Sequence, residues 1–309
     1  MGSIGLAIHG GAGTILRSSM TPELEAEYRS GIESGLRSGW EVLSSGGTAL
    51  DAVEAAVVSL EDFPLFNAGR GSVFTHEGKN EMDAAVMDGS QLRAGAVAFV
   101  RNVKNPIRLA RLVMERTPHV LLAAEGANQF AREMDVEHAP DEYFFTEHRW
   151  LQLQDAIAAG RIQLDHADYA AEPRPIGTVG AVACDSEGRL AAASSTGGMT
   201  NKRFGRVGDT PLIGAGTYAD DVCAVSCTGH GEYFMLGVAG YDVSARMRYN
   251  RQPLGDAANS TVGQLAAIGG EGGLVAIDRH ANVSLPFNSE GMYRGWVSPD
   301  GTFNVGIYN

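Results

Sequence analysis

A threonine stands directly after a glycine at Gly177-Thr178, and a group of hydroxyl and glycine residues lies further along the chain, from Ser194 to Thr200. A threonine hydroxyl needs a neighbouring base to act as a nucleophile. If the chain is cut before Thr178, the new α-amine can be that base, because it titrates near ~7.7–8.0 whereas lysine titrates near ~10.4. Gly177 suits the cut, since glycine permits the close approach that an N-to-O acyl shift needs. The residues alone leave open a plainer alternative, a polar hairpin end with a flexible loop.

A predicted hairpin brings these two groups together. Residues 178–184 and 189–195 are strand-like runs of small residues joined by the sequence DSEG, which is typical of turns. A turn centred on the two middle residues of DSEG pairs Thr178 with Ser195. We therefore expect Thr178 to lie beside Ser195 and Thr196 at one end of the hairpin.

The elements that must position this end begin with a mixture of strands and helices. The apolar run Ile4 to Ile8 predicts a buried strand that leads into a loop, His9-Gly-Gly-Ala-Gly13. A helix capped by Thr21-Pro22 and a second helix that begins at Thr48 and ends at Pro64 should follow. The remaining elements expected in this half are an antiparallel meander within 73–100, helices around 107–113 and 150–159, and a short apolar run over 119–124.

The second half is expected to contain more strands than helices. Residues 160–176 lack apolar periodicity and contain two prolines, which indicates an exposed linker. Beyond the hairpin, the pattern predicts a helix over 233–249 and strands over 222–227, 273–278, 283–287 and 302–307.

Composition and charge exclude several classes of function. The 309 residues include 24 Lys+Arg and 37 Asp+Glu, for a net charge of −13, and no local basic patch suggests a nucleic-acid or membrane-surface partner. No apolar run approaches the ~18 residues of a membrane span, and the first residues do not resemble an export signal. The three cysteines, Cys184, Cys223 and Cys227, argue against a disulfide framework. We expect a cytoplasmic protein.

Two other catalytic patterns are considered and rejected. His230 lies near Glu232 and Cys227, which suggests zinc chemistry, but a zinc site needs three protein ligands and the sequence has no CxxC or HExxH motif. The loop at His9 looks like the oxyanion loop of α/β-hydrolase esterases, but that fold needs a GxSxG elbow, which is absent.

Seven segments in this order closely resemble one family, and the resemblance covers nearly the whole chain. The family is the plant-type asparaginases and isoaspartyl peptidases, a branch of the N-terminal-nucleophile hydrolases. The segments are His9-Gly-Gly-Ala-Gly13, Pro64-Leu-Phe-Asn-Ala-Gly69, Met82-Asp-Ala-Ala-Val-Met-Asp-Gly89, Gly177-Thr-Val-Gly-Ala-Val182, Ser195-Thr-Gly-Gly-Met-Thr-Asn-Lys202, Gly205-Arg-Val-Gly-Asp209 and Ser226-Cys-Thr-Gly-His-Gly-Glu232.

The resemblance implies an α+β fold, the four-layer αββα sandwich in which two mainly antiparallel sheets lie between helical layers. It implies one domain, 1–309, that cuts itself between Gly177 and Thr178. The α part, 1–177, would end in a linker of about 160–177, and the β part would be 178–309. The family expectation is a homodimer of these αβ units, a heterotetramer of chains.

The implied reaction is hydrolysis of a β-aspartyl amide, either L-asparagine or an isoaspartyl dipeptide. Thr178 would be the nucleophile, and Thr196 would form a hydrogen bond near it. The Thr228 hydroxyl and the Gly229 N–H would form the oxyanion hole. Without the resemblance, Thr228 to Gly231 could equally be a strand-to-helix turn capped by Thr228.

The resemblance also assigns substrate binding. Arg206 would bind the α-carboxylate through its guanidinium fork, and Asp209 would bind the α-ammonium, with Gly229 and Gly231 lining the pocket beside them. From their spacing alone, Arg206 and Asp209 could instead form an ordinary surface ion pair, which is worth about 0–1 kcal/mol.

No organic cofactor is expected. The segment 60–70 matches a family loop that binds a structural sodium ion through main-chain carbonyls, and Asn67 in this loop either approaches the active site or has a capping or packing role. The implied sodium ligands are the carbonyls of Leu60, Glu61, Phe63, Phe66, Ala68 and Arg70.

Two alternative functions remain. A glycosylasparaginase would use the same nucleophile on N-linked sugar stubs, although such enzymes are exported. A relative that does not cut itself could act as a binding protein, and chain cleavage distinguishes that case.

Overall fold

The computed structural model describes residues 2–160 and 177–309. Both helix caps expected near the start of the chain are present. Helix α1 (Pro22–Ser44) begins after Thr21, whose side chain accepts a hydrogen bond from Leu24 N. Helix α2 (Ala49–Glu61) begins after Thr48, which accepts from Asp51 N. The linker predicted over about 160–177 lies, apart from its two ends, outside the described residues.

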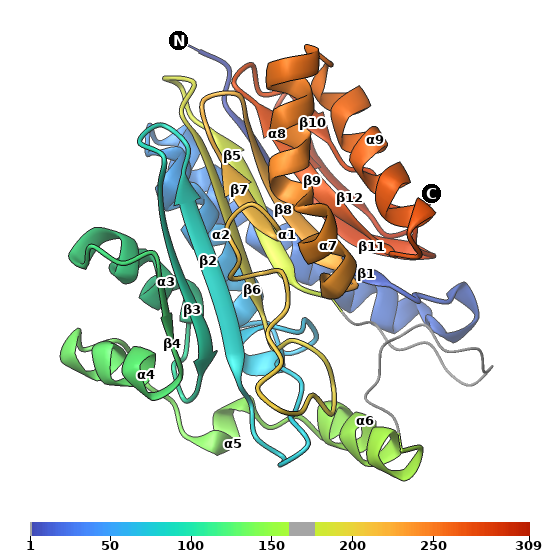
Figure 1. Cartoon of the computed structure of the whole chain (residues 1–309). Helices are drawn as coiled ribbons and strands as arrows, with labels where there is room; N and C mark the ends of the chain where they lie inside the picture. The colour runs from blue at the N-terminus through green and yellow to red at the C-terminus, as the bar shows by residue number, and fades with distance from the viewer. Residues whose placement is uncertain (1, 161–176) are drawn as a thin grey trace.

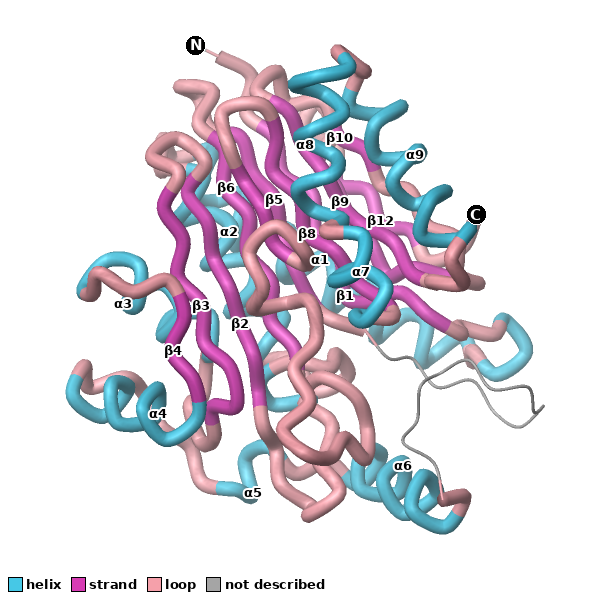
Figure 2. Tube along the Cα trace, viewed as in Figure 1, coloured by secondary structure: helices cyan, strands magenta, loops and turns pink. Residues whose placement is uncertain are grey.

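The strands form two sheets that lie face to face (Figures 1 and 2). Neighbours are antiparallel except for the β3–β4 pair, which is parallel. The eight-stranded sheet has the order β12 (Phe303–Gly306), β11 (Gly291–Val297), β1 (Gly5–Gly13), β5 (Val179–Cys184), β6 (Leu190–Thr196), β2 (Met82–Asp88), β3 (Arg93–Val100) and β4 (Leu121–Ala123). The four-stranded sheet has the order β10 (Val283–Ser284), β9 (Gly272–Asp278), β8 (Cys223–Gly229) and β7 (Thr217–Ala219).

Helices cover the outer face of each sheet, as Figure 1 shows. The large sheet is covered by α1, α2 and α3 (Pro106–Arg116). The small sheet is covered by α7 (Gly231–Gly237), α8 (Ala239–Asn250) and α9 (Leu254–Ala267). The other short helices are η1 (Arg17–Ser19), η2 (Gly69–Gly71), α4 (Ala124–Glu133), α5 (Asp141–Phe144) and α6 (Glu147–Ala158). The predicted α+β sandwich of four layers is confirmed.

Each contact between layers has its own apolar core. One cluster lies between the large sheet and its helices and includes Ile8 and Val57. A second lies between the small sheet and its helices and includes Val225 and Val262. The third fills the space between the two sheets, and several of its members are alanines such as Ala192. Small side chains in this third core let the sheets approach closely, so polar side chains at the strand ends can meet across them.

Three expectations about local structure are wrong. Strand β1 runs on through His9 to Gly13, predicted as a loop, because this segment pairs with β11 through a bulge and its first part with β5. The 73–100 region forms only β2 and β3, not a longer meander. The helix predicted over 233–249 is two helices, α7 and α8, which separate at Val238, where φ is +46°.

The predicted hairpin is present, but its register is shifted by one residue. Val179 pairs with Ser195, and Cys184 pairs with Leu190. The cause is a three-residue loop, in which Gly188 adopts a φ of +74° and Asp185 pairs with Arg189. The predicted partner of Thr178, Ser195, is therefore wrong, and the register carried on by one residue places Thr178 opposite Thr196.

Candidate active site

Thr178 stands at the start of β5, at a crowded junction of backbones. It is buried, its N–H donates to Thr228 Oγ1 at 3.2 Å, and its own Oγ1 lies 3.3 Å from Thr210 Oγ1. The preceding Gly177 packs against Gly11, so that a Cβ on Gly177 would lie 2.1 Å from Gly11 Cα. Glycine is therefore required on both sides of this contact, which lies directly before Thr178.

The Thr228 hydroxyl is arranged as a donor. Its Oγ1 accepts from two N–H groups, those of Thr178 and Ala12, each at 3.2 Å. With both lone pairs used, its remaining interaction is the donation of its own proton. The next residue, Gly229, has a φ of +139°, and a Cβ there would lie 2.4 Å from Glu271 O. This backbone geometry, which needs glycine, fits the predicted oxyanion hole.

Thr196 lies at the same end of the hairpin as Thr178, and its surroundings are held by Asn67. Thr196 Oγ1 accepts from Gly198 N at 2.9 Å. The side-chain Nδ2 of Asn67 donates to Gly198 O at 2.7 Å, and the main-chain carbonyl of Asn67 accepts from Gly197 N at 3.1 Å. The side chain of Asn67 therefore fixes the loop that follows Thr196.

Arg206 and Asp209 do not form the ion pair that their spacing allowed. The Arg206 guanidinium binds Glu232 through two hydrogen bonds of 3.0 and 2.9 Å. Asp209 is buried, and its Oδ2 has no hydrogen-bond partner among residues 2–160 and 177–309. Burial raises the pKa of Asp209 to about 7, against the opposing effect of Arg206. A buried carboxylate oxygen without a hydrogen-bond partner can accept from a cation such as an ammonium group.

Gly231 keeps the space between these two side chains open. A Cβ at this position would lie 2.7 Å from Asp209 Oδ1 and 3.0 Å from Arg206 Nη2. A ligand that presents a carboxylate and an ammonium on one carbon, as an α-amino acid does, can address both residues at this point.

Thr210 was missed by the sequence reasoning. Its hydroxyl is the one in contact with the Thr178 hydroxyl, and it is almost fully buried. The signal available was its place directly after Asp209, inside a segment already assigned to the site.

The loop predicted to bind sodium is curled in a way that fits a cation. Gly69 has a φ of +50°, and a Cβ there would lie 2.5 Å from Glu61 O. A Cβ on Gly71 would lie 2.0 Å from Phe66 O and 2.5 Å from Pro64 O. The two glycines thus bring the loop back onto its own carbonyl groups, the hard oxygen ligands that such a cation prefers. The Glu61 side chain points elsewhere and accepts from Ser195 Oγ at 2.6 Å.

No group of three or more metal-binding side chains of the His, Cys, Asp or Glu type occurs in the part of the chain that the structure describes. His230 Nε2 lies 3.6 Å from Glu232 Oε2, and its ring packs edge-on against Tyr233. Cys227 is buried, and burial raises the pKa of its thiol.

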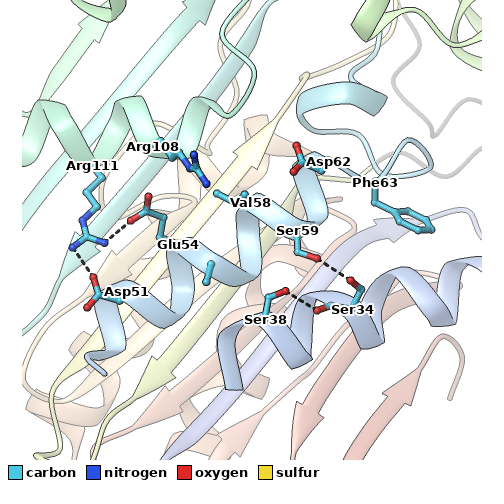
Figure 3. Close-up of a pocket in the computed structure, with 11 residues that line it drawn as sticks. Ser34, Ser38, Asp51, Glu54, Val58, Ser59, Asp62, Phe63, Arg108 and Arg111 are labelled. Atoms are coloured by element: carbon cyan, nitrogen blue, oxygen red, sulfur yellow. Dashed lines mark hydrogen bonds and ion pairs between the residues drawn. The ribbon is translucent and has the colours of Figure 1, made fainter. Parts of the chain in front are cut away.

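A groove of about 670 Å³ lies on the helical layer formed by α1, α2 and α3, away from the two sheets (Figure 3). Its serine hydroxyls bond to each other or to backbone, as in the pair Ser34 and Ser59. Of its three carboxylates, Asp51 and Glu54 are held by Arg111, and Asp62 accepts from Asn105 and Tyr143. These polar groups are engaged with one another, so the groove offers no base beside a free hydroxyl among its lining residues.

Comparison with known proteins assigns the chain to a family. The family model described as Asparaginase matches residues 2–307. The chain belongs to this asparaginase family. It is 52% identical over 306 residues to an isoaspartyl peptidase of Salmonella typhimurium, covering 98% of each chain, and 50% identical over 311 residues to an isoaspartyl peptidase of Escherichia coli, covering 100% of this chain and 97% of that one.

The family extends to eukaryotes. A protein of Arabidopsis thaliana named probable isoaspartyl peptidase/L-asparaginase 2 is 41% identical over 327 residues, with full coverage of both chains. The predicted family is therefore confirmed, and this chain is an enzyme of the amidohydrolase type. Among the described residues, no helix is both long and apolar enough to cross a membrane.

Proposed function

We propose that this chain hydrolyses β-aspartyl amides, releasing L-aspartate and an amino acid from isoaspartyl dipeptides, or L-aspartate and ammonia from L-asparagine. The observation that carries the proposal is the buried contact of Thr178 with Thr228 and with Thr210, which directly follows Asp209, whose Oδ2 has no hydrogen-bond partner among the described residues. Names of the relatives support the substrate class.

Maturation comes first. The Thr178 hydroxyl attacks the Gly177 carbonyl, the C–N bond breaks as the nitrogen takes up a proton, and an ester joins Gly177 to Thr178 Oγ1. Water then splits this ester into a Gly177 carboxylate and a free Thr178. The cut leaves an α part, 1–177, and a β part, 178–309. Close packing of Gly177 on Gly11 supports this step, because it restricts the backbone next to the bond to be cut.

The free Thr178 amine then serves as the base. It takes the hydroxyl proton as Oγ1 attacks the β-carbonyl of the substrate, and it gives that proton to the departing nitrogen. The Thr228 hydroxyl and the Gly229 N–H donate to the oxyanion, and Thr196 donates near the nucleophile. Water finally hydrolyses the β-aspartyl ester and releases aspartate.

Substrate recognition uses charge. The α-carboxylate binds Arg206 in place of the Glu232 carboxylate, which occupies the same guanidinium edge in this structure. The α-ammonium binds the buried Asp209, and a partner for Oδ2, which has none within the described residues, favours binding. Gly229 and Gly231 line the amino side of the pocket.

We also propose a structural sodium ion, held by carbonyls of the 60–70 loop, that neutralises their converging dipoles and stiffens the loop carrying Asn67. It supplies no step of the reaction, and no organic cofactor is required. A homodimer of αβ units in the cytoplasm completes the proposal.

Intact-mass measurement of purified protein, with a parallel assay on asparagine and on an isoaspartyl dipeptide, tests the proposed function. We expect two fragments with Thr178 as a new N-terminus, and activity that rises with cleavage. Thr178→Ala should stay uncut and inactive. A wild-type chain that stays intact and inactive would instead favour the binding-protein alternative, and a cut Thr178→Ala chain would refute autocleavage.

A further inference from the structure

A chain of polar side chains runs through the middle of the apolar space between the two sheets. His9 Nε2 lies 2.8 Å from Ser226 Oγ, and Ser226 Oγ lies 2.7 Å from Ser194 Oγ. Thr217 Oγ1 lies 2.7 Å from Ser194 Oγ. All four side chains are completely buried, and they come alternately from the large and small sheets. A buried polar network costs desolvation energy, so its placement calls for a reason.

The two ends of this chain lead back to Thr178 and to the strand that follows it. At one end, Thr217 Oγ1 lies 3.1 Å from Thr210 O, and the Thr210 hydroxyl contacts the Thr178 hydroxyl. At the other end, His9 pairs in the sheet with Gly180, two residues after Thr178. The path thus closes through the main chain, and we call it the inter-sheet ring; its members are the side chains of His9, Ser226, Ser194 and Thr217, together with Thr210, which Thr217 contacts at the main-chain carbonyl.

Gly180 leaves the space in which the ring forms. It lies two residues after the nucleophile and pairs with His9 on one side and with Ser194 on the other. A Cβ on Gly180 would lie 1.9 Å from Ser226 Oγ and 2.5 Å from His9 Nε2. Any side chain on this residue would push the ring apart, so the strand that begins with Thr178 is shaped around it.

The ring is electrically neutral. Burial lowers the pKa of His9 to about 3, and the nearby Thr178 backbone only partly offsets this effect. His9 is thus an uncharged imidazole and too weak a base to replace the Thr178 amine. His9 can instead help to orient its neighbours, because a network of short hydrogen bonds holds its members in one arrangement.

We propose that the inter-sheet ring is a positioning device for the nucleophile, and that it fixes Thr178 through the His9 side and the Thr210 side together. The inference rests on the proposed function and adds positioning residues to it. No ring side chain takes part in bond making. The ring sets where the Thr178 hydroxyl points, and a misplacement of about 1 Å can cost roughly 100-fold in rate.

Ser226→Ala opens the ring by removing one hydroxyl, and Gly180→Ala opens it by steric pressure without removing a polar group. Ser194→Ala is the alternative if Ser226→Ala does not accumulate as folded protein. The matched control is Ser244→Ala, which deletes an equally buried hydroxyl that donates to Asp220, away from the ring. For each variant we would measure the rate of cleavage before Thr178, kcat and KM on an isoaspartyl dipeptide, and the thermal midpoint.

We expect the ring variants to lower both kcat and the cleavage rate by at least about 10-fold, with KM nearly unchanged because Arg206 and Asp209 lie outside the ring. Ser244→Ala should lower only the thermal midpoint. Folded ring variants with wild-type kcat and cleavage rate would overturn the inference alone, given an active wild type. A wild type that neither cuts itself nor turns over substrate would overturn the proposed function, and this inference with it.

Discussion

Gly231→Ala tests the proposed amino-acid site through the space between its two charged residues. The added methyl group would lie 2.7 Å from Asp209 Oδ1 and 3.0 Å from Arg206 Nη2, so the carboxylate must move. The carboxylate then cannot keep its position for the α-ammonium. Loss of one charge-assisted hydrogen bond costs roughly 1.5–3 kcal/mol, which corresponds to about a 10- to 150-fold fall in kcat/KM. Most of this fall should appear in KM, because the nucleophile and oxyanion hole are untouched.

The fold itself should tolerate this change. Gly231 is the first residue of α7, its φ is not positive, and alanine at a helical position lowers the entropy lost on folding. Gly263→Ala, in α9, is a matched control, because nothing lies within 4 Å of its Cβ position. The assay is steady-state hydrolysis of an isoaspartyl dipeptide, with thermal midpoints for both variants. A wild-type KM for Gly231→Ala would refute the assignment of this space to the substrate.

Three further predictions concern the same site. Thr228→Val removes the oxyanion donor and should lower kcat by about 100- to 1,000-fold, and a loss below about 10-fold would remove Thr228 from the oxyanion hole. Arg206→Ala should raise KM strongly while cleavage before Thr178 continues, and intact-mass and kinetic measurements on one preparation compare the two. Asp209, with a pKa of about 7, and the Thr178 amine both act unprotonated, and free α-amines titrate near ~7.7–8.0, so kcat/KM should fall as pH drops below about 8. A profile flat between about pH 5 and 9 would contradict both roles.

Local patterns in the sequence predicted most of the elements around the site. The Thr21 and Thr48 caps, the β5–β6 hairpin and the β8 strand need only neighbouring residues to be recognised. The predicted hairpin register is wrong by one residue, because the sequence DSEG suits a two-residue loop as well as a three-residue loop. The choice depends on whether Gly188 adopts a positive φ.

The elements that were missed lack a local signal. The sequence pattern does not predict strand β11 or helix α9. It also ends the first strand before the glycine-rich run that β1 includes. Strand β11 pairs with β1 and β12, and it brings the C-terminal part of the chain to the strand that carries His9. Pairing partners so far away in the sequence decide whether a glycine-rich run is a loop or a strand.

The sequence by itself predicted the chemistry of this protein, because the residue types expected for a nucleophile, a cleavage site and charged binding groups occur in a recognisable order. Tertiary structure alone decided which groups touch. Three contacts join residues that lie far apart in the sequence: Arg206 with Glu232, Thr210 with Thr178, and His9 with Ser226. Burial also leaves Asp209 Oδ2 without a hydrogen-bond partner among the described residues. Such contacts arise when two sheets stack, and stacking depends on the whole core and not on any one segment.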